Sequence, residues 1–339
     1  MTRTSPPVRE VLGEYLAHVE VENSSHHVKN KISYLKKFFG SELLGAKEPC
    51  KGVFLGETLE DVRAGDVRRL IDSLPVGKKT KRHHRNAFHS FFEHAMKCGF
   101  YEPSNFRYPN PMSALPSYYE NNKKIVFLTQ PQIDAVLEVL KPSPAVRMAA
   151  AIMIYAGLRR AETLWLTKSN VAGNLKFLSV VNKTDEEKDL ESSLKTGERS
   201  VPILPPLKAL LEPYLESLKS EWICPSPRGM QWDGDNFGAS HHRLVRAAEL
   251  HHTCLHYRHT FATQRAAGDW SLFRISKTMG NSIAVCEKYY AASVDPSARR
   301  RMGKPKAMFT SGRLPSGEYR SPKVSYLLLR AAEKASPCA

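Results

Sequence analysis

The residues of this 339-residue chain that could do chemistry are a set of cations and a pair of adjacent tyrosines near the end of its second domain, Tyr289 and Tyr290. The sequence contains no GxxxxGK[ST] phosphate loop, no GxSxG nucleophile elbow and no HExxH zinc motif. The pairs His83-His84 and His251-His252 lack partners at zinc-ligand spacing, so we expect no metal site. Guanidinium groups can grip phosphodiester oxygens bidentately, and a tyrosine hydroxyl can act as a nucleophile. These residue types suit chemistry on a phosphodiester.

Four segments carry these residues in a fixed order. They are YAGLRRAE (155–162), LKTGER (194–199), YRHTFAT (257–263), and MGNS (279–282) followed by EKYY (287–290). Over about residues 145–295, their order and spacing resemble the arginine boxes, hairpin lysine and closing tyrosine segment of the tyrosine recombinase (phage integrase) family. One such box would be a weak signal, whereas four boxes in order are a strong one.

The resemblance implies roles for three cations. Arg159 and Arg258 fall on the family's catalytic arginines, which would stabilise the charge that develops on the phosphate in the transition state. Arg160 is the neighbouring alternative, but the Gly-Leu-Arg register favours Arg159. Glu162, three residues after Arg159 on the same helix face, could orient it. Lys195 matches the hairpin lysine that would protonate the 5′-oxygen leaving group.

The closing segment leaves two tyrosines open as the nucleophile. Asn281 stands where the family has His or Trp, and its amide can still donate a hydrogen bond to a phosphate oxygen. The family spacing of nine residues from this position selects Tyr290, whereas aligning EKYY with a one-residue deletion selects Tyr289. We prefer the ungapped count and expect the other tyrosine to be a packing residue. The family's tyrosine forms a 3′-phosphotyrosyl intermediate, which conserves bond energy, so we expect no cofactor.

A second departure from the family's pattern concerns the base that would remove the proton of the tyrosine. Three residues before Arg258 the family usually has His, and here that position is Leu255. Because the pKa of a tyrosine is about 10, a base or strong electrostatic help must free the phenolate. His256 is a speculative substitute, with a core or surface role as the alternative. His259 matches the family but is expected to pack or orient without bonding phosphate.

Hydrophobic periodicity predicts a mainly α fold with a small β-sheet. Apolar residues at helical spacing predict helices at 8–20, from Ser25 to Phe39, 59–74, 78–96, 130–140, 145–155, 207–218, 236–250, 260–267 and 272–279. Segments 174–182 and 199–204 are predicted as strands of a β-hairpin with a long polar loop.

The predicted domains follow from these elements and from the resemblance. Residues 1–105 form a helical core-binding (SAM-like) domain, 106–122 a Pro- and Asn-rich linker, and 123–296 a mixed α/β catalytic domain. The basic tail 297–339 contains a short apolar helix candidate at 324–332, which either docks on a neighbouring subunit or packs on its own chain.

The net charge of +16 is unevenly distributed. Residues 1–120 and 121–296 each carry a net +4, whereas the 43-residue tail carries +8. In the N-terminal part, one cluster has no acid between Asp72 and Glu93, and we predict that it grips DNA phosphates: Lys78, Lys79, Lys81, Arg82 and Arg85. A pI near 9.6 agrees with a polyanionic partner.

The sequence thus predicts a site-specific DNA recombinase or integrase that binds double-stranded DNA and works as a homo-tetramer on two recombination sites. The alternatives are a catalytically inactive DNA-binding relative and a type IB topoisomerase-like enzyme. The six cysteines show no CxxC spacing, the N-terminus has no apolar leader and no apolar run approaches a membrane span. We therefore expect a cytoplasmic, nucleoid-associated protein without membrane contact.

Overall fold

A computed structural model of the chain describes residues 6–23, 25–103, 107–119, 125–185, 190–192, 197–268 and 270–294. The chain divides into two compact units, Met1–Lys123 and Lys124–Ala339. Lys195 and the tail 297–339 lie outside the described residues. Within the described part, no helix has both the length and the apolar character needed to cross a membrane.

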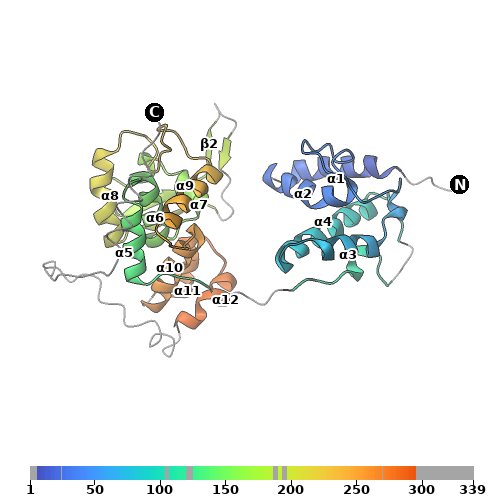
Figure 1. Ribbon diagram of the computed structural model, residues 1–339. Helices are drawn as coiled ribbons and strands as arrows, with labels where there is room; N and C mark the ends of the chain where they lie inside the picture. Colours follow the sequence, from blue (N-terminus) through green and yellow to red (C-terminus); the bar gives the residue numbers. More distant parts are fainter. Residues whose placement is uncertain are drawn as a thin grey trace. The chain divides into compact units, whose positions relative to one another are not determined.

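The N-terminal unit is helical (Figure 1). Its elements are α1 (Val8–Glu22), α2 (Ser25–Phe39), the short η1 (Leu59–Asp61), α3 (Ala64–Ser73) and α4 (Lys78–Lys97). Phe88, Phe91 and Phe92 of α4 follow helical spacing and are fully buried. Phe88 meets Phe38 of α2 edge-on, and Phe91 meets Tyr15 of α1. The C-terminal half of α4 therefore lies in the core of this unit, whereas Lys78 and Lys79 at its start are exposed.

Part of the segment predicted as a linker packs onto this unit. The helical turn η2 (Pro111–Ala114) places Met112 and Leu115 in the core of the N-terminal helices. Asn110 is buried just before it, and its amide Nδ2 donates to the carbonyl oxygen of His89 and to Glu93 Oε1, at 2.9 and 3.0 Å. Composition alone predicts an extended segment here, because two apolar side chains among prolines show no periodicity.

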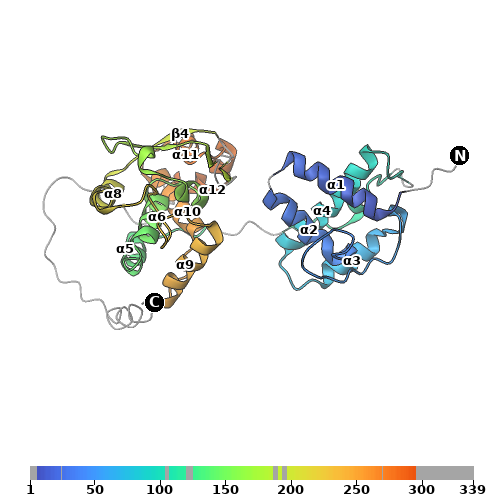
Figure 2. The same cartoon turned by 90° about the horizontal axis from the view of Figure 1, so that it is seen from above.

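The C-terminal unit is built around one buried helix, α6 (Pro144–Tyr155). Every residue of α6 from Met148 onward is buried, and Figures 1 and 2 show it among α5, α8, α9 and α10. The other helices are α5 (Gln130–Val139), α7 (Arg160–Leu164), η3 (Lys168–Asn170), α8 (Pro205–Ser217), α9 (Gly234–Ala247), α10 (Cys254–Ala267), α11 (Leu272–Met279) and α12 (Ile283–Val294). A second apolar cluster joins α10 to α11 and α12 through Phe261, Ile275, Met279 and Tyr290.

In the part of this unit that the structure describes, four short strands form two antiparallel pairs. β1 (Phe177–Val180) pairs with β4 (Arg199–Pro202), with Leu178 opposite Val201 and both side chains buried. β2 (Lys183–Asp185) pairs with β3 (Leu190–Ser192) inside the segment predicted as a long loop. The prediction of a mainly α fold with a small β-sheet is confirmed.

Helix α10 begins six residues earlier than its periodicity predicts. Thr253 caps it, since its Oγ1 accepts from the backbone N–H of His256 and its own N–H bonds to the ring of His256. The early start places Arg258 and His259 on the helix itself, where backbone geometry fixes the direction of both side chains.

Candidate functional site

Arg159 is positioned by a tight turn between α6 and α7. Gly157 in this turn has φ +68°, and a Cβ there would lie 2.4 Å from Cδ1 of Phe261. Only glycine satisfies both the left-handed backbone and the close approach of α10. The turn places Arg159 at the N-cap of α7, where its backbone N–H donates to Glu162 Oε2 at 2.8 Å.

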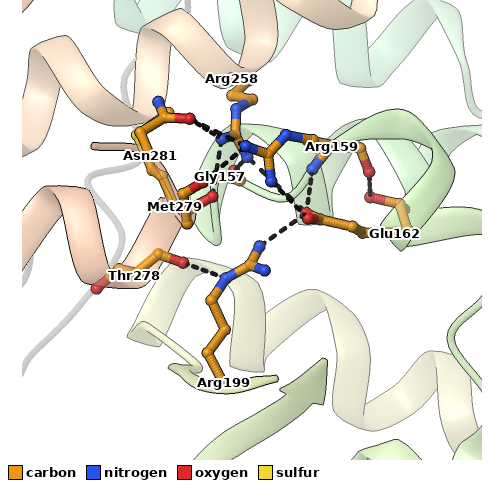
Figure 3. Close-up of polar contacts among 10 residues, drawn as sticks. Gly157, Arg159, Glu162, Arg199, Arg258, Thr278, Met279 and Asn281 are labelled. Atoms are coloured by element: carbon orange, nitrogen blue, oxygen red, sulfur yellow. Dashed lines mark hydrogen bonds and ion pairs between the residues drawn. The ribbon is translucent and has the colours of Figure 1, made fainter. Parts of the chain in front are cut away.

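The carboxylate of Glu162 is the centre of the site (Figure 3). It is buried and accepts Nη1 of Arg159 on Oε1 at 2.8 Å and Nη2 of Arg199 on Oε2 at 2.7 Å, while Nη1 of Arg258 lies 3.9 Å from Oε2. Burial raises the pKa of Glu162, but the hydrogen bonds and charges of Arg199 and Arg159 outweigh burial and hold that pKa below its ordinary value. The expectation that Glu162 orients Arg159 agrees with this geometry.

Arg258 is a buried cation held by backbone carbonyls. Its Nη1 donates to the carbonyl oxygen of Gly157 at 2.5 Å and its Nη2 to that of Met279 at 2.8 Å. Burial lowers the pKa of Arg258 to about 10, with a further lowering from Arg159, so the group remains charged at neutral pH. A buried guanidinium whose donors are already oriented needs little rearrangement to receive an anion.

Asn281 joins the two predicted catalytic arginines. Its Oδ1 accepts from Nη2 of Arg258 at 2.9 Å and from Nη2 of Arg159 at 3.1 Å. Gly280, left-handed at φ +65° and C-capping α11, sets this position, and its carbonyl oxygen accepts Nη2 of Arg159 at 2.6 Å. The amide oxygen thus bridges the cations. Among the described residues the amide nitrogen has no hydrogen-bond partner, which leaves it for the donor role predicted from the sequence.

Arg199, which was not predicted from the sequence, is a third guanidinium of this cluster. It opens β4, and its Nε donates to the carbonyl oxygen of Thr278 at 2.9 Å while its Nη2 reaches Glu162. Its Nη1 is buried without a hydrogen-bond partner among the described residues. The available signal was its place at the start of a predicted strand, four residues after Lys195. Lys195 itself lies outside the described residues.

The two candidate nucleophiles have different environments. Tyr290 is 2% exposed, and its hydroxyl lies 2.8 Å from Nδ1 of His259. Burial raises the pKa of Tyr290 to about 12, against a lowering by the charge of Arg258. Tyr289 is 39% exposed, and the ammonium of Lys288 lies 5.6 Å from its ring centre. The charge of Arg258, a predicted catalytic arginine, thus acts on the pKa of Tyr290, and the hydroxyl of Tyr290 is hydrogen-bonded to an imidazole.

Leu255 and His256 are the two residues that bear on the missing base. Leu255 is 60% exposed on the surface of α10. The ring Nδ1 of His256 accepts the backbone N–H of Thr253 at 3.3 Å, so this imidazole caps its own helix. The placement of His256 favours the alternative of a structural role over that of a base, because its accepting nitrogen is already engaged.

The five predicted DNA-contacting cations lie on the first half of α4. Lys78 and Lys79 are exposed, whereas Lys81 donates to the carbonyl oxygen of Asp72 at 2.7 Å and Arg85 to that of Leu115 at 3.4 Å. Among the described residues, these cations form no ion pair with a carboxylate, and the first turn of α4 contains no acid. Cations at a helix N-terminus oppose the helix dipole, so this placement costs stability unless an anion compensates it.

Within the ranges that the structure describes, His, Cys, Asp and Glu form no group of three or more that could hold a metal ion. The histidine pair of α4 has other contacts. His83 stacks on the ring of Tyr34 at 5.8 Å, and Nδ1 of the buried His84 lies 2.9 Å from the carbonyl oxygen of Tyr34. Both rings thus contribute to the packing of α4 on α2.

Comparison with known proteins gives a family and a fold. The model of the phage integrase family matches residues 126–295. A lambda integrase dimer bound to a COC′ core site has 15% identity, with 92% of this chain and 81% of that chain covered and a TM-score of 0.62. The Tn1549 transposon integrase in complex with a circular intermediate DNA has 18% identity, coverage of 88% and 99%, and a TM-score of 0.66.

A lambda integrase tetramer bound to a Holliday junction is also similar, with 16% identity, coverage of 82% of this chain and 78% of that chain, and a TM-score of 0.63. Comparison with curated proteins gives no match. At such identities, the similarity to solved structures establishes the fold alone.

Proposed function

The chain belongs to the phage integrase family of tyrosine recombinases, and from this premise we propose that it is a site-specific DNA recombinase that cleaves and rejoins DNA through a 3′-phosphotyrosyl intermediate. The observation that carries the proposal is the pair of guanidiniums of Arg159 and Arg258, joined through Oδ1 of Asn281. Two adjacent, preoriented cations suit the non-bridging oxygens of a phosphodiester.

The proposed reaction transfers one bond at phosphorus. The hydroxyl oxygen of Tyr290 attacks the scissile phosphorus and loses its proton as the new P–O bond forms, and the bond from phosphorus to the 5′-oxygen breaks. Lys195 donates a proton to the leaving 5′-oxygen. Arg159 and Arg258 stabilise the charge on the five-coordinate phosphorus, and Asn281 keeps the two guanidiniums together. In the reverse direction, a 5′-hydroxyl of the same or another strand attacks the phosphotyrosine and releases Tyr290.

The first prediction is a covalent adduct. Wild-type protein incubated with nicked duplexes tiled across the DNA that flanks its gene is expected to give an SDS-resistant protein–DNA band, because a fragment released at the nick prevents rejoining. Mass spectrometry of the digested adduct is expected to find the nucleotide on the peptide that contains Tyr289 and Tyr290.

The two alternative functions predict other outcomes, in this experiment and in assays of plasmid relaxation and strand exchange. Tight binding to these duplexes without an adduct on any of them would favour an inactive DNA-binding relative. An adduct accompanied by relaxation of supercoiled plasmid, but by no strand exchange between two sites, would favour a topoisomerase-like enzyme.

We further propose that the α4 cations grip double-stranded DNA independently of its sequence. Replacing Lys78, Lys79 and Arg82 together by Ala is expected to weaken binding to a 30-base-pair duplex of arbitrary sequence. The slope of log affinity against log salt concentration should become shallower by about 0.9 for each phosphate that the variant no longer neutralises. Fluorescence anisotropy at several salt concentrations measures both quantities.

A matched triple variant controls for net charge. Lys47, Lys51 and Lys97 are exposed on the same unit, and their replacement by Ala removes the same charge outside the cluster. Equal slopes for the two triple variants would mean that the charge acts only through the general field, and the assignment of phosphate binding to the first half of α4 would fail.

The proposed assembly is a homo-tetramer on two recombination sites. A lambda integrase tetramer bound to a Holliday junction is among the structures that the chain resembles in fold. A recombinase that exchanges four strands needs four nucleophiles, which a tetramer provides. The proposed location is the cytoplasm, in association with the nucleoid, because the proposed substrate is DNA.

A further inference from the structure

A hydrogen bond between α10 and α12 in the C-terminal unit joins two residues for which the sequence predicts no common role. Nδ1 of His259 lies 2.8 Å from the hydroxyl oxygen of Tyr290. Leu255, at the position where the family usually has His, is exposed and has no nitrogen to accept a proton. The imidazole of His256 is engaged with the backbone of Thr253. The described contacts therefore bring one imidazole to the proposed nucleophile.

We propose that His259 is the catalytic base that accepts the phenolic proton of Tyr290. The inference rests on the proposed function, and it makes His259 a proton acceptor, whereas the sequence predicts only a packing or orienting role for this residue. A base must lie within hydrogen-bond reach of the proton it removes, and 2.8 Å meets this condition.

The surroundings of His259 keep its ring neutral and able to accept. Burial lowers the pKa of His259, and the nearby His256 and Arg258 of the same helix lower it further. From α12, the rings of Tyr289 and Tyr290 contact it, and Cys286 lies beside Tyr290 with its own thiol pKa raised by burial. Neither α6 nor α11, which also pack on α10, contributes a charged group that shifts this pKa.

The direction of the hydrogen bond follows from these two environments. The hydroxyl of Tyr290, with a pKa of about 12, keeps its proton at neutral pH and is the donor. In a neutral imidazole one of the two ring nitrogens carries no hydrogen, and in His259 we infer that this nitrogen is Nδ1. Nε2 then bears the hydrogen, and among the described residues it has no hydrogen-bond partner.

The proton transfer balances within the proposed reaction. As the oxygen of Tyr290 bonds to phosphorus, its proton passes to Nδ1 of His259, which becomes an imidazolium beside Arg258. The bond from phosphorus to the 5′-oxygen breaks, and that oxygen takes its proton from Lys195. On rejoining, the imidazolium returns the proton to the departing tyrosine oxygen. The transient positive charge of the imidazolium also stabilises the negative charge that develops on the non-bridging oxygens of the phosphate.

The test compares two substitutions at His259 on a nicked duplex that gives an adduct with the wild type. His259→Ala removes the base, and His259→Asn keeps a polar group of similar reach without a basic nitrogen. Both are expected to slow single-turnover adduct formation by about 10²–10⁴-fold. The wild-type rate should rise with pH as His259 loses its proton, and both variants should lack this rise. Added imidazole is expected to restore part of the rate of His259→Ala only.

Three outcomes would overturn the inference. The first is a wild-type rate and pH profile in His259→Ala. The second is full activity in His259→Asn, which would indicate a packing role. The third is loss of the pH-dependent rise in His256→Ala rather than in the His259 variants. His242→Ala, an exposed histidine of α9, serves as the control and is expected to keep the wild-type rate and profile.

A measurement without DNA separates this inference from the proposed function. In ¹⁵N NMR of the full chain, Nδ1 of His259 should appear unprotonated near neutral pH, and its shift should change in Tyr290→Phe. A protonated Nδ1 would contradict the inference even if the wild type forms an adduct. Absence of any wild-type adduct would instead contradict the proposed function, and the base role would fall with it.

Discussion

Tyr290→Phe is expected to abolish the covalent protein–DNA adduct, whereas Tyr289→Phe is expected to form it at the wild-type rate. The phenolic oxygen of Tyr290 is the proposed nucleophile, and phenylalanine has no atom that can replace it. The ring of Tyr290 packs with Phe261, Ile275 and Cys286, and phenylalanine keeps these apolar neighbours. The measurement is the SDS-resistant band on a nicked duplex that reacts with the wild type.

The control for these two substitutions is a test that both variants remain folded. Tyr290→Phe loses the hydrogen bond to His259, which costs about 0.5–1.5 kcal/mol, so both variants should remain folded and bind DNA. Thermal unfolding and anisotropy on the intact duplex verify this. Persistence of the adduct in Tyr290→Phe together with its loss in Tyr289→Phe would select the gapped alignment and reverse the assignment.

The parts of the site that are local in sequence could be predicted from it. Arg159 and Glu162 are three residues apart, and helical spacing alone brings their side chains together. The ungapped spacing between Asn281 and Tyr290 spans one helix start and selects the tyrosine whose hydroxyl is hydrogen-bonded to His259.

The contacts that the sequence did not reveal join distant segments. Arg199 reaches Glu162 across 37 residues, and His259 reaches Tyr290 across 31. Neither contact has a period or a motif, because each depends on how β4 and α12 pack against α7 and α10. The contacts of Asn281 Oδ1 with the two arginines also join distant segments. The left-handed residue Gly280 ends α11 just before Asn281 and sets the position of this side chain.

The fold shows the same division between local and tertiary information. Helices were predictable where apolar residues repeat at helical spacing, as in α4. The burial of Met112 was not, since this residue lies among prolines and becomes part of a core only through contacts with α4 and the rest of its unit. The start of α10 had a local signal in the cap at Thr253, which periodicity alone does not use.

Glu162→Gln is expected to lower the free energy of unfolding of the C-terminal unit by about 3–5 kcal/mol. The carboxylate faces three guanidiniums, and those of Arg199 and Arg258 are themselves about nine-tenths buried. Glutamine keeps the shape and can still accept a hydrogen bond, but it leaves these cations without the negative charge that offsets their burial. Chemical denaturation followed by tryptophan fluorescence measures the decrease, because all four tryptophans of the chain lie in this unit.

The pH dependence of this effect has a definite sign. The folded-state pKa of Glu162 lies below its ordinary value of 4.5, so its contribution to stability is fully present above that value and is lost as the pH falls through the folded-state pKa. The difference in stability between wild type and Glu162→Gln should therefore be largest near neutral pH and shrink in acid. Glu216→Gln, an exposed change of the same charge on α8, should change stability little at either pH. An equal effect of the two substitutions would mean that Glu162 acts through net charge alone, and the buried carboxylate would then not be what holds the three arginines in place.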